Sequence, residues 1–242
     1  MDNGTRKKIV VIPAWYPNPS EPVNGVFIQD QALCLARRYD VTVIYPRLSA
    51  WRELLGFRPR PRLAQQEEMG IHEWRVPEQG LLRLSLVLRG LVARDNGTPK
   101  AYYRQFSSAV RRGFAHYVRE RGRPDVIHAH VVLPAGWVAL DLGARYRVPV
   151  ILIEHSGPFT THLRTGEQRA MVRGVLRRAD RVVAVSPALR AIIHRFCPDV
   201  EVRVVGNVIR TEFFTPGDSP PAPRSRFRFL LVALLDEGKG VQ

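Results

Sequence analysis

The hydrophobic positions of this 242-residue sequence fall into short apolar runs that alternate with longer segments of helical periodicity. Several short runs are continuously apolar, which is typical of strands covered on both faces. Strands are predicted at 8–12, 41–45, 71–76, 125–129, 148–153, 181–185 and 202–205. Helices are predicted at 26–38, 100–121, 135–145, 166–178 and 187–195. This alternation predicts an α/β fold built on a Rossmann-like, doubly wound parallel sheet.

The segment 47–96 interrupts the alternation with a long stretch rich in arginine and leucine. Within it, residues 79–94 place leucines near one helical face, with Arg83, Arg89 and Arg94 around them. A basic amphipathic helix of this kind is typical of an element that lies on an anionic membrane surface. An ordinary helix with its leucines in the core and its arginines in water has the same pattern, so both interpretations stay open.

The segment 215–226 is dense in proline, glycine and serine, which is typical of a linker. After it, residues 227–242 read as a new strand followed by a loop with two glycines. A single strand and loop cannot bury their own faces. We therefore predict an N-terminal domain at 1–214, a linker at 215–226 and the start of a truncated second domain at 227–242.

The net charge of +15 favours an anionic partner such as a phosphorylated substrate, anionic lipid or nucleic acid. Because nearly all the basic residues are arginines, biased codon usage explains the charge equally well. The apolar runs fall short of the ~20 residues that span a bilayer. Cys34 and Cys197 have no ligand-like spacing, as expected in a reducing compartment. We expect a cytoplasmic protein, with peripheral attachment to the cytoplasmic face of the membrane as the alternative.

The first predicted strand runs into a proline-rich loop, "PAWYPNPSEPVNG", before its helix. Ligands of open parallel sheets bind at the carboxyl ends of the strands, where helix N-termini present free N–H groups. Gly25 ends this loop and would allow a close approach of the backbone to a bound group. The loop matches neither a dinucleotide fingerprint nor a phosphate loop, and a plain structural turn is the alternative.

Two further strand ends bring polar residues to the same edge of the predicted sheet. His128 and His130 end one strand in "DVIHAHVVLPAGW", and Glu154 and His155 end another in "ILIEHSGPF". A His-x-His pair alone is a weak metal signal, so we expect two structural histidines, or one structural and one in a pocket. The sequence contains no G-x-S-x-G motif, which a serine hydrolase of the α/β type would need. The convergence predicts a site for a polar or phosphorylated small molecule.

The last motif, "VVGNVIRTEFFTP", joins a strand to a turn that contains Asn207. An asparagine in this place can hold a turn through its own side chain. We nevertheless count Asn207 among the candidate binding residues.

Taken together, these motifs resemble the N-terminal half of family 4 glycosyltransferases, retaining enzymes of the GT-B architecture that use nucleotide sugars. The motifs that carry the resemblance are "WYPNPSEPVNGVFIQDQALCLAR", "PDVIHAHVVLPAG", "VPVILIEHSGPF", "ADRVVAVSPALR", "VRVVGNVIRTEFFTP" and "FLLVALLDEGKGV". They span nearly the whole chain. The resemblance implies transfer of a sugar with retention to a glycan or lipid-linked acceptor, with no metal or other cofactor.

The resemblance also implies roles for particular residues. The loop that ends in Asn24 and Gly25 resembles the glycine loop that lies against the donor phosphates and the acceptor. His130 matches the histidine close to the transferred sugar, and the loop with Glu154 and His155 faces the same cleft. Lys239 matches the lysine that contacts the donor diphosphate.

This chain departs from the family pattern before that lysine. The family has Gly-Arg there, whereas this sequence has Ala233 and Leu234, so the arginine contact to the diphosphate is not expected. The glutamates that hold the donor in the family would lie beyond Gln242. We therefore expect the 242-residue chain alone to transfer little or no sugar.

Two other functional classes fit parts of the sequence. A Rossmann-like protein that binds nucleic acid or anionic lipid would use the +15 charge, but it needs clustered basic residues with exposed aromatics, and these arginines are scattered. A GT-B sugar-nucleotide epimerase would share the architecture. The proline-rich loop and its "NGVF" end favour a transferase.

Overall fold

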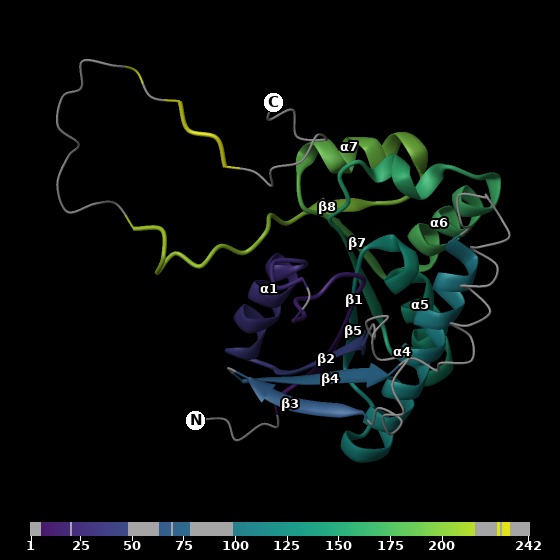
Figure 1. The fold of residues 1–242 in the computed structure, drawn as a ribbon. Helices are drawn as coiled ribbons and strands as arrows, with labels where there is room; N and C mark the ends of the chain where they lie inside the picture. The colour runs from purple at the N-terminus through teal and green to yellow at the C-terminus, as the bar shows by residue number, and fades with distance from the viewer. Residues whose placement is uncertain are drawn as a thin grey trace, which may run out of the picture. The chain divides into compact units, whose positions relative to one another are not determined.

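The computed structural model describes residues 6–19, 21–47, 63–68, 70–77, 99–215, 227 and 229–232. These residues form an α/β unit around a single sheet (Figure 1). Its strands are β1 (Lys8–Pro13), β2 (Asp40–Arg47), β3 (Ala64–Glu68), β4 (Ile71–Pro77), β5 (Val126–His130), β6 (Val150–Glu154), β7 (Arg181–Ala184) and β8 (Val202–Val204). Its helices are α1 (Val26–Ala36), α4 (Pro99–Arg121), α5 (Trp137–Tyr146), α6 (Gly166–Arg178) and α7 (Pro187–Phe196).

The eight strands described lie in the order β3-β4-β2-β1-β5-β6-β7-β8. All neighbouring pairs are parallel except β3 with β4. The chain leaves β1 toward β2 on one side and later returns to β5 on the other. The direction of winding therefore reverses between β1 and β5, which is the switch point where open α/β sheets bind ligands. The predicted doubly wound fold is confirmed.

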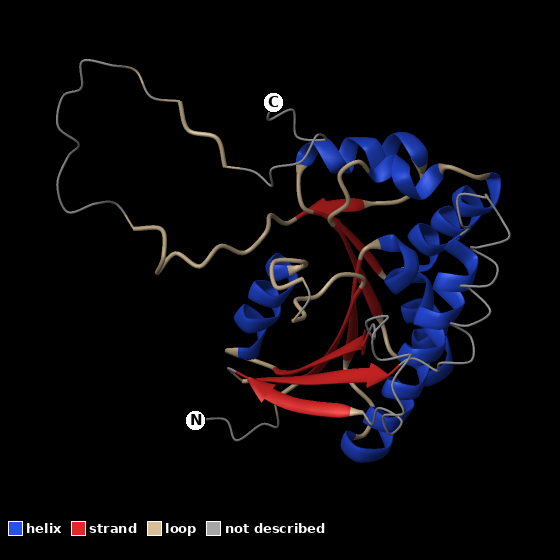
Figure 2. Cartoon of the chain, in the orientation of Figure 1, coloured by secondary structure: helices blue, strands red, loops and turns tan. Residues whose placement is uncertain are grey.

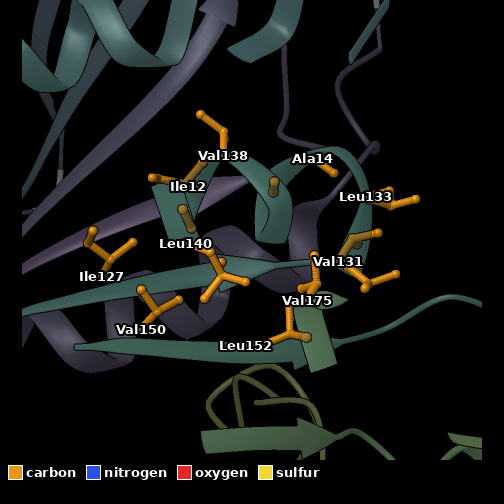
Figure 3. Packing of buried hydrophobic residues seen from close by; sticks show 14 of the residues in the cluster. Ile12, Ala14, Ile127, Val131, Leu133, Val138, Leu140, Val150, Leu152 and Val175 are labelled. Atoms are coloured by element: carbon orange, nitrogen blue, oxygen red, sulfur yellow. The ribbon is translucent and has the colours of Figure 1, made fainter. Parts of the chain in front are cut away.

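Helices cover both faces of this sheet, as Figures 1 and 2 show. On one face α1 packs Ile28 and Ala32 against Ile9 and Val11 of β1. On the other face, helices α4, α5 and α6 enclose the larger core. Figure 3 shows part of this core, in which Ile127, Val150 and Leu152 from the sheet lie with Val138 and Leu140 of α5. Alternate β1 residues thus face opposite cores, which explains why this strand is apolar throughout.

The seven strands and five helices predicted from the alternating pattern all form, with boundaries shifted by a few residues. The sequence does not predict β3, because "AQQEE" has no apolar face. This strand pairs antiparallel with β4 at the end of the sheet. A polar sequence is tolerated there since an edge strand needs only its backbone hydrogen bonds on one side. Between β5 and α5 the chain forms a π-helical turn, η1 (Val132–Gly136), and a 3₁₀ helix, η2 (Phe159–Leu163), precedes α6.

The chain divides into two units, and the second unit begins at Arg210, directly after the unit that ends at Ile209. In it, the strand predicted from residue 227 is not formed where the structure describes the chain. Phe227 and Phe229–Val232 have no regular structure and highly exposed side chains. A strand exists only where a neighbour pairs with its backbone. Residues 216–226 of the predicted linker lie outside the described residues, as do 79–94 with Arg83, Arg89 and Arg94.

Where the structure describes the chain, no helix combines the length and the apolar character needed to cross a membrane.

Candidate functional site

The loops that follow β1, β5 and β6 meet at the carboxyl end of the sheet, beside the switch point. The first residue of the loop after β1 is bonded to the end of β5, because the Ala14 N–H donates to the His130 carbonyl at 3.1 Å. The first residue of the loop after β5 is bonded to β6 in the same way, because the Val131 N–H donates to the Ile153 carbonyl at 2.8 Å. Backbone hydrogen bonds therefore link the three predicted polar clusters before any side chain is considered.

The proline-rich loop is anchored to β4 through two buried side chains. The hydroxyl of Tyr16, which is 1% exposed, donates to Glu73 at 2.8 Å. Arg75 donates to the other oxygen of Glu73 at 2.9 Å and to the Pro17 carbonyl at 3.2 Å. A buried carboxylate is stable here since an arginine and a hydroxyl both donate to it. The anchor fixes the start of the loop on the sheet.

Gly25 ends the loop and begins α1 with a left-handed backbone, at φ 74°. A Cβ at this position would lie 2.8 Å from the Tyr16 nitrogen and closer still to the Trp15 carbonyl. The close approach that requires glycine is therefore to the loop's own backbone. The side chain of Asn24 lies next to it and donates to Glu21 at 2.9 Å.

The two predicted histidines, His130 and His155, form a pair. Their rings stack at 5.2 Å between centroids and 21° between planes, and Nδ1 of His130 lies 3.0 Å from Nε2 of His155. At this distance one nitrogen carries the hydrogen and the other accepts it. Phe27, in the first turn of α1, packs on the other side of His155 at 4.8 Å between ring centroids. The pair thus joins the loops after β5 and β6 to the start of α1.

Burial keeps these histidines neutral near pH 7. It lowers the pKa of His130 well below its ordinary value, with smaller contributions from His128 and His155. Burial likewise lowers the pKa of His155 to about 4, which a hydrogen bond with Asn207 partly opposes. His128 meets His130 edge to face, and burial lowers its pKa to about 4. A neutral imidazole can both donate and accept a hydrogen bond, so the pair suits a polar, uncharged substrate group.

Glu154 is buried and contacts the backbone of the loops after β5 and β6. Its side chain is fully buried, and its oxygens accept hydrogen bonds from the backbone N–H groups of Val132, His155 and Ser156 at 2.7–2.9 Å. The Ser156 hydroxyl continues the network to His162 at 2.8 Å. The carboxylate therefore shapes the two loops.

The structure brings Gly25, His130, His155 and Asn207 to one edge of the sheet. Asn207 is exposed and lies near enough to His155 to raise the pKa of that imidazole. Lys239 lies outside the described residues. Among the residues described, no group of three or more histidine, cysteine or acidic side chains is arranged to hold a metal ion.

Sequence reasoning missed three residues that shape this edge: Phe27, Tyr16 and Glu73. Glu73 carried the clearest signal, because a lone carboxylate inside the apolar strand "IHEWRVP" must find a partner when the strand is buried. Nothing local pairs it with Tyr16, which is 57 positions away. Phe27 shows no sign in the sequence of packing on a histidine from another strand.

The comparisons with known proteins agree with this geometry. The sequence profile of Glycosyltransferase Family 4 matches residues 25–213, most of the chain. The chain belongs to glycosyltransferase family 4. No curated protein matches it. The profile begins at Gly25 and includes the histidine pair and Asn207.

Solved structures show the same fold at low sequence identity. A sucrose-phosphate synthase from Thermosynechococcus elongatus has a TM-score of 0.52 and 15% identity, covering 86% of this chain and 93% of that one. HepE from Anabaena, in complex with UDP-glucose, has a TM-score of 0.52 and 16% identity, covering 87% and 46%. A UDP-glucosyltransferase from Polygonum tinctorium has a TM-score of 0.52 and 14% identity, covering 86% and 54%. This family 4 chain spans about half the length of the last two.

Proposed function

We propose that the protein transfers a sugar from a nucleotide-sugar donor to an acceptor, with retention of configuration. The observation that carries the proposal is the neutral, hydrogen-bonded pair of His130 and His155 at the switch point of a family 4 domain. The resemblance to family 4 places His130 close to the transferred sugar. HepE, which shares the fold, was solved with UDP-glucose, and this supports a nucleotide sugar as the donor.

In this mechanism His130 and His155 orient hydroxyl groups by hydrogen bonds rather than by charge. Their low pKa values keep positive charge away from the reacting carbon, where an oxocarbenium-like charge develops as the glycosidic bond breaks. The acceptor hydroxyl attacks on the face that the diphosphate leaves, and its proton passes to an oxygen of the departing diphosphate. No protein nucleophile takes part, and no metal is required. In the same proposal, Lys239 contacts the departing diphosphate.

The start of α1 is the best placed helix end for the leaving diphosphate. Gly25 offers it no side-chain cap, whereas Thr165 caps α6 and Ser186 caps α7 through hydrogen bonds to backbone N–H groups. Helix α5 also begins without a side-chain cap, but its N-cap residue, Gly136, is buried. Free N–H groups at a helix start favour anions. Asn24, next to Gly25, and Asn207, near His155, are proposed to contact the donor or the acceptor.

The acceptor is proposed to be a glycan or lipid-linked sugar of the cell envelope, which places the protein in polysaccharide biosynthesis on the cytoplasmic side of the membrane. The charge of +15 supports an anionic surface or a phosphorylated acceptor. Family membership favours a transferase over a nucleic-acid or lipid-binding domain. Since the chain spans about half of HepE, we expect little transfer by these 242 residues alone.

The test is an assay of the protein encoded by the complete reading frame that contains this sequence. A panel of nucleotide sugars is supplied, and release of nucleoside diphosphate is measured with and without bacterial lipid extract. Consumption of one donor, with a product anomer that matches the donor's in proton NMR, supports the proposal. An inverted product contradicts retention. If no donor is consumed at millimolar concentration, the proposed transferase activity is contradicted.

A further inference from the structure

We infer that Glu154 is a positioning residue, whose buried carboxylate sets the geometry of the His130–His155 pair. The hydrogen bonds of this carboxylate go to backbone N–H groups rather than to either ring. It acts through the backbone of the two loops that carry them. The catalytic meaning of the inference rests on the proposed function, but the geometry that it predicts does not.

The first observation is the set of groups that Glu154 holds. One oxygen accepts the Val132 N–H at 2.7 Å, in the loop after β5. The other accepts the N–H groups of His155 at 2.9 Å and Ser156 at 2.7 Å, in the loop after β6. One carboxylate thus joins the loop that follows His130 to the residue that stacks on it. Hydrogen bonds to a carboxylate are about twice as strong as those between neutral groups.

The second observation is the strained backbone between His130 and Val132. Val131 has φ 80° and ψ 132°, a region that a β-branched residue rarely adopts. The N–H groups on both sides of this strain are held by the end of β6: Val131 donates to the Ile153 carbonyl, and Val132 donates to Glu154. Such a strained backbone persists only where surrounding contacts enforce it. Glu154 supplies one of those contacts.

The third observation is that the carboxylate also occupies the start of η1, where Val132 is the first residue. The next residue, Leu133, has an extended backbone at φ −131° and ψ 134°. The carboxylate therefore holds the first N–H group of an irregular turn rather than the start of a regular helix. Only a carboxylate accepts all three hydrogen bonds, because a glutamine in its place would turn an N–H₂ group toward one of the three donors.

The test compares E154Q with the matched control D180N. Asp180 accepts the Val150 N–H at 2.8 Å, at the opposite end of the same strand, so D180N removes a comparable carboxylate contact far from the histidines. In ¹⁵N-labelled protein, the scalar coupling between Nδ1 of His130 and Nε2 of His155 reports the hydrogen bond directly. We expect this coupling in the wild type and in D180N, and its loss in E154Q. In the transfer assay, kcat should fall up to about 100-fold in E154Q, with KM changed by less than a factor of about three.

Wild-type coupling in folded E154Q overturns the inference, as does its absence from the wild type. If E154Q does not fold, E154D is measured instead, since its oxygens are withdrawn by one methylene group and cannot span both loops. Retained coupling in E154D then overturns the inference, and lost coupling supports it. A protein that shows the coupling pattern but transfers no sugar contradicts the proposed function and leaves the role of Glu154 standing.

Discussion

Gly25 shows how a single residue determines the shape of the candidate site. Its positive φ and the peptide between Trp15 and Tyr16 both exclude a side chain. The sequence predicted that glycine was needed for a close approach, and it placed Gly25 at the start of the helix. It could not show that the approaching group belongs to the same loop, because the contact depends on how the prolines fold the chain back.

Replacing Gly25 with alanine should destabilise the protein more than the same change at Gly70. Both residues have positive φ, but a Cβ at Gly70 would meet nothing within 4 Å. G70A should therefore cost only the backbone term of ~1–2 kcal/mol, while G25A should cost at least ~3 kcal/mol because the loop must also move. Urea unfolding of both variants checks this, and equal losses would show that the packing against Trp15 does not matter.

His128 should make the stability of the protein depend on pH. Its folded pKa is about 4 against an ordinary 6.5, so the unfolded chain binds the proton first as pH falls. Stability from this residue is complete above pH 6.5 and is lost between pH 6.5 and about 4. In H128F that loss should be smaller by on the order of 3 kcal/mol. Urea unfolding from pH 7.5 to 4 measures the difference, and parallel curves for the two proteins would contradict the burial of a neutral imidazole.

At the scale of elements, the proline-rich loop behaves as a rigid part of the sheet edge. Prolines limit its backbone, and the bonds from Tyr16 and Arg75 hold it to β4. The sequence predicted a stiff loop from its composition. The anchor was beyond sequence reasoning, because β4 reaches the loop only through the strand order in which β2 lies between β1 and β4.

The variant Y16F tests this anchor. It removes the hydroxyl that donates to Oε1 of buried Glu73 at 2.8 Å. The expected cost is about 1–3 kcal/mol, with faster amide hydrogen exchange in the loop residues 17–24. The control is Y39F, on a partly buried tyrosine outside the loop. Unchanged exchange in Y16F would mean that the prolines alone hold the loop.

The histidine pair marks the limit of sequence reasoning at this scale. Strand ends predicted that His130 and His155 lie at one edge, since β5 and β6 are parallel neighbours. The arrangement of their rings depends on the strained turn at Val131 and on the buried contacts of Glu154. From the sequence, Glu154 was predicted only as a candidate binding residue. Alternating apolar runs determine where a strand lies, whereas the orientation of a side chain beyond its end depends on contacts from other elements.

At the scale of the whole molecule, the order of the strands places the histidine pair at the switch point of a family 4 domain. This explains why weak local signals, each of them compatible with a plain turn or a structural histidine, converge on one edge. The fold was predictable because strand and helix patterns alternate along most of the chain. The donor and the acceptor were not predictable, because selectivity for them depends on the orientation of side chains beyond the strand ends, which strand and helix patterns do not determine.

The most direct test of the central claim is the effect of H130A on donor consumption by the protein from the complete reading frame. The control is H194Q, an exposed histidine on α7. We expect H130A to lower kcat/KM by at least about 100-fold while its unfolding free energy remains sufficient for a folded protein, and H194Q to match the wild type. Consumption by folded H130A at the wild-type rate would contradict the claim that this edge of the sheet is the substrate site.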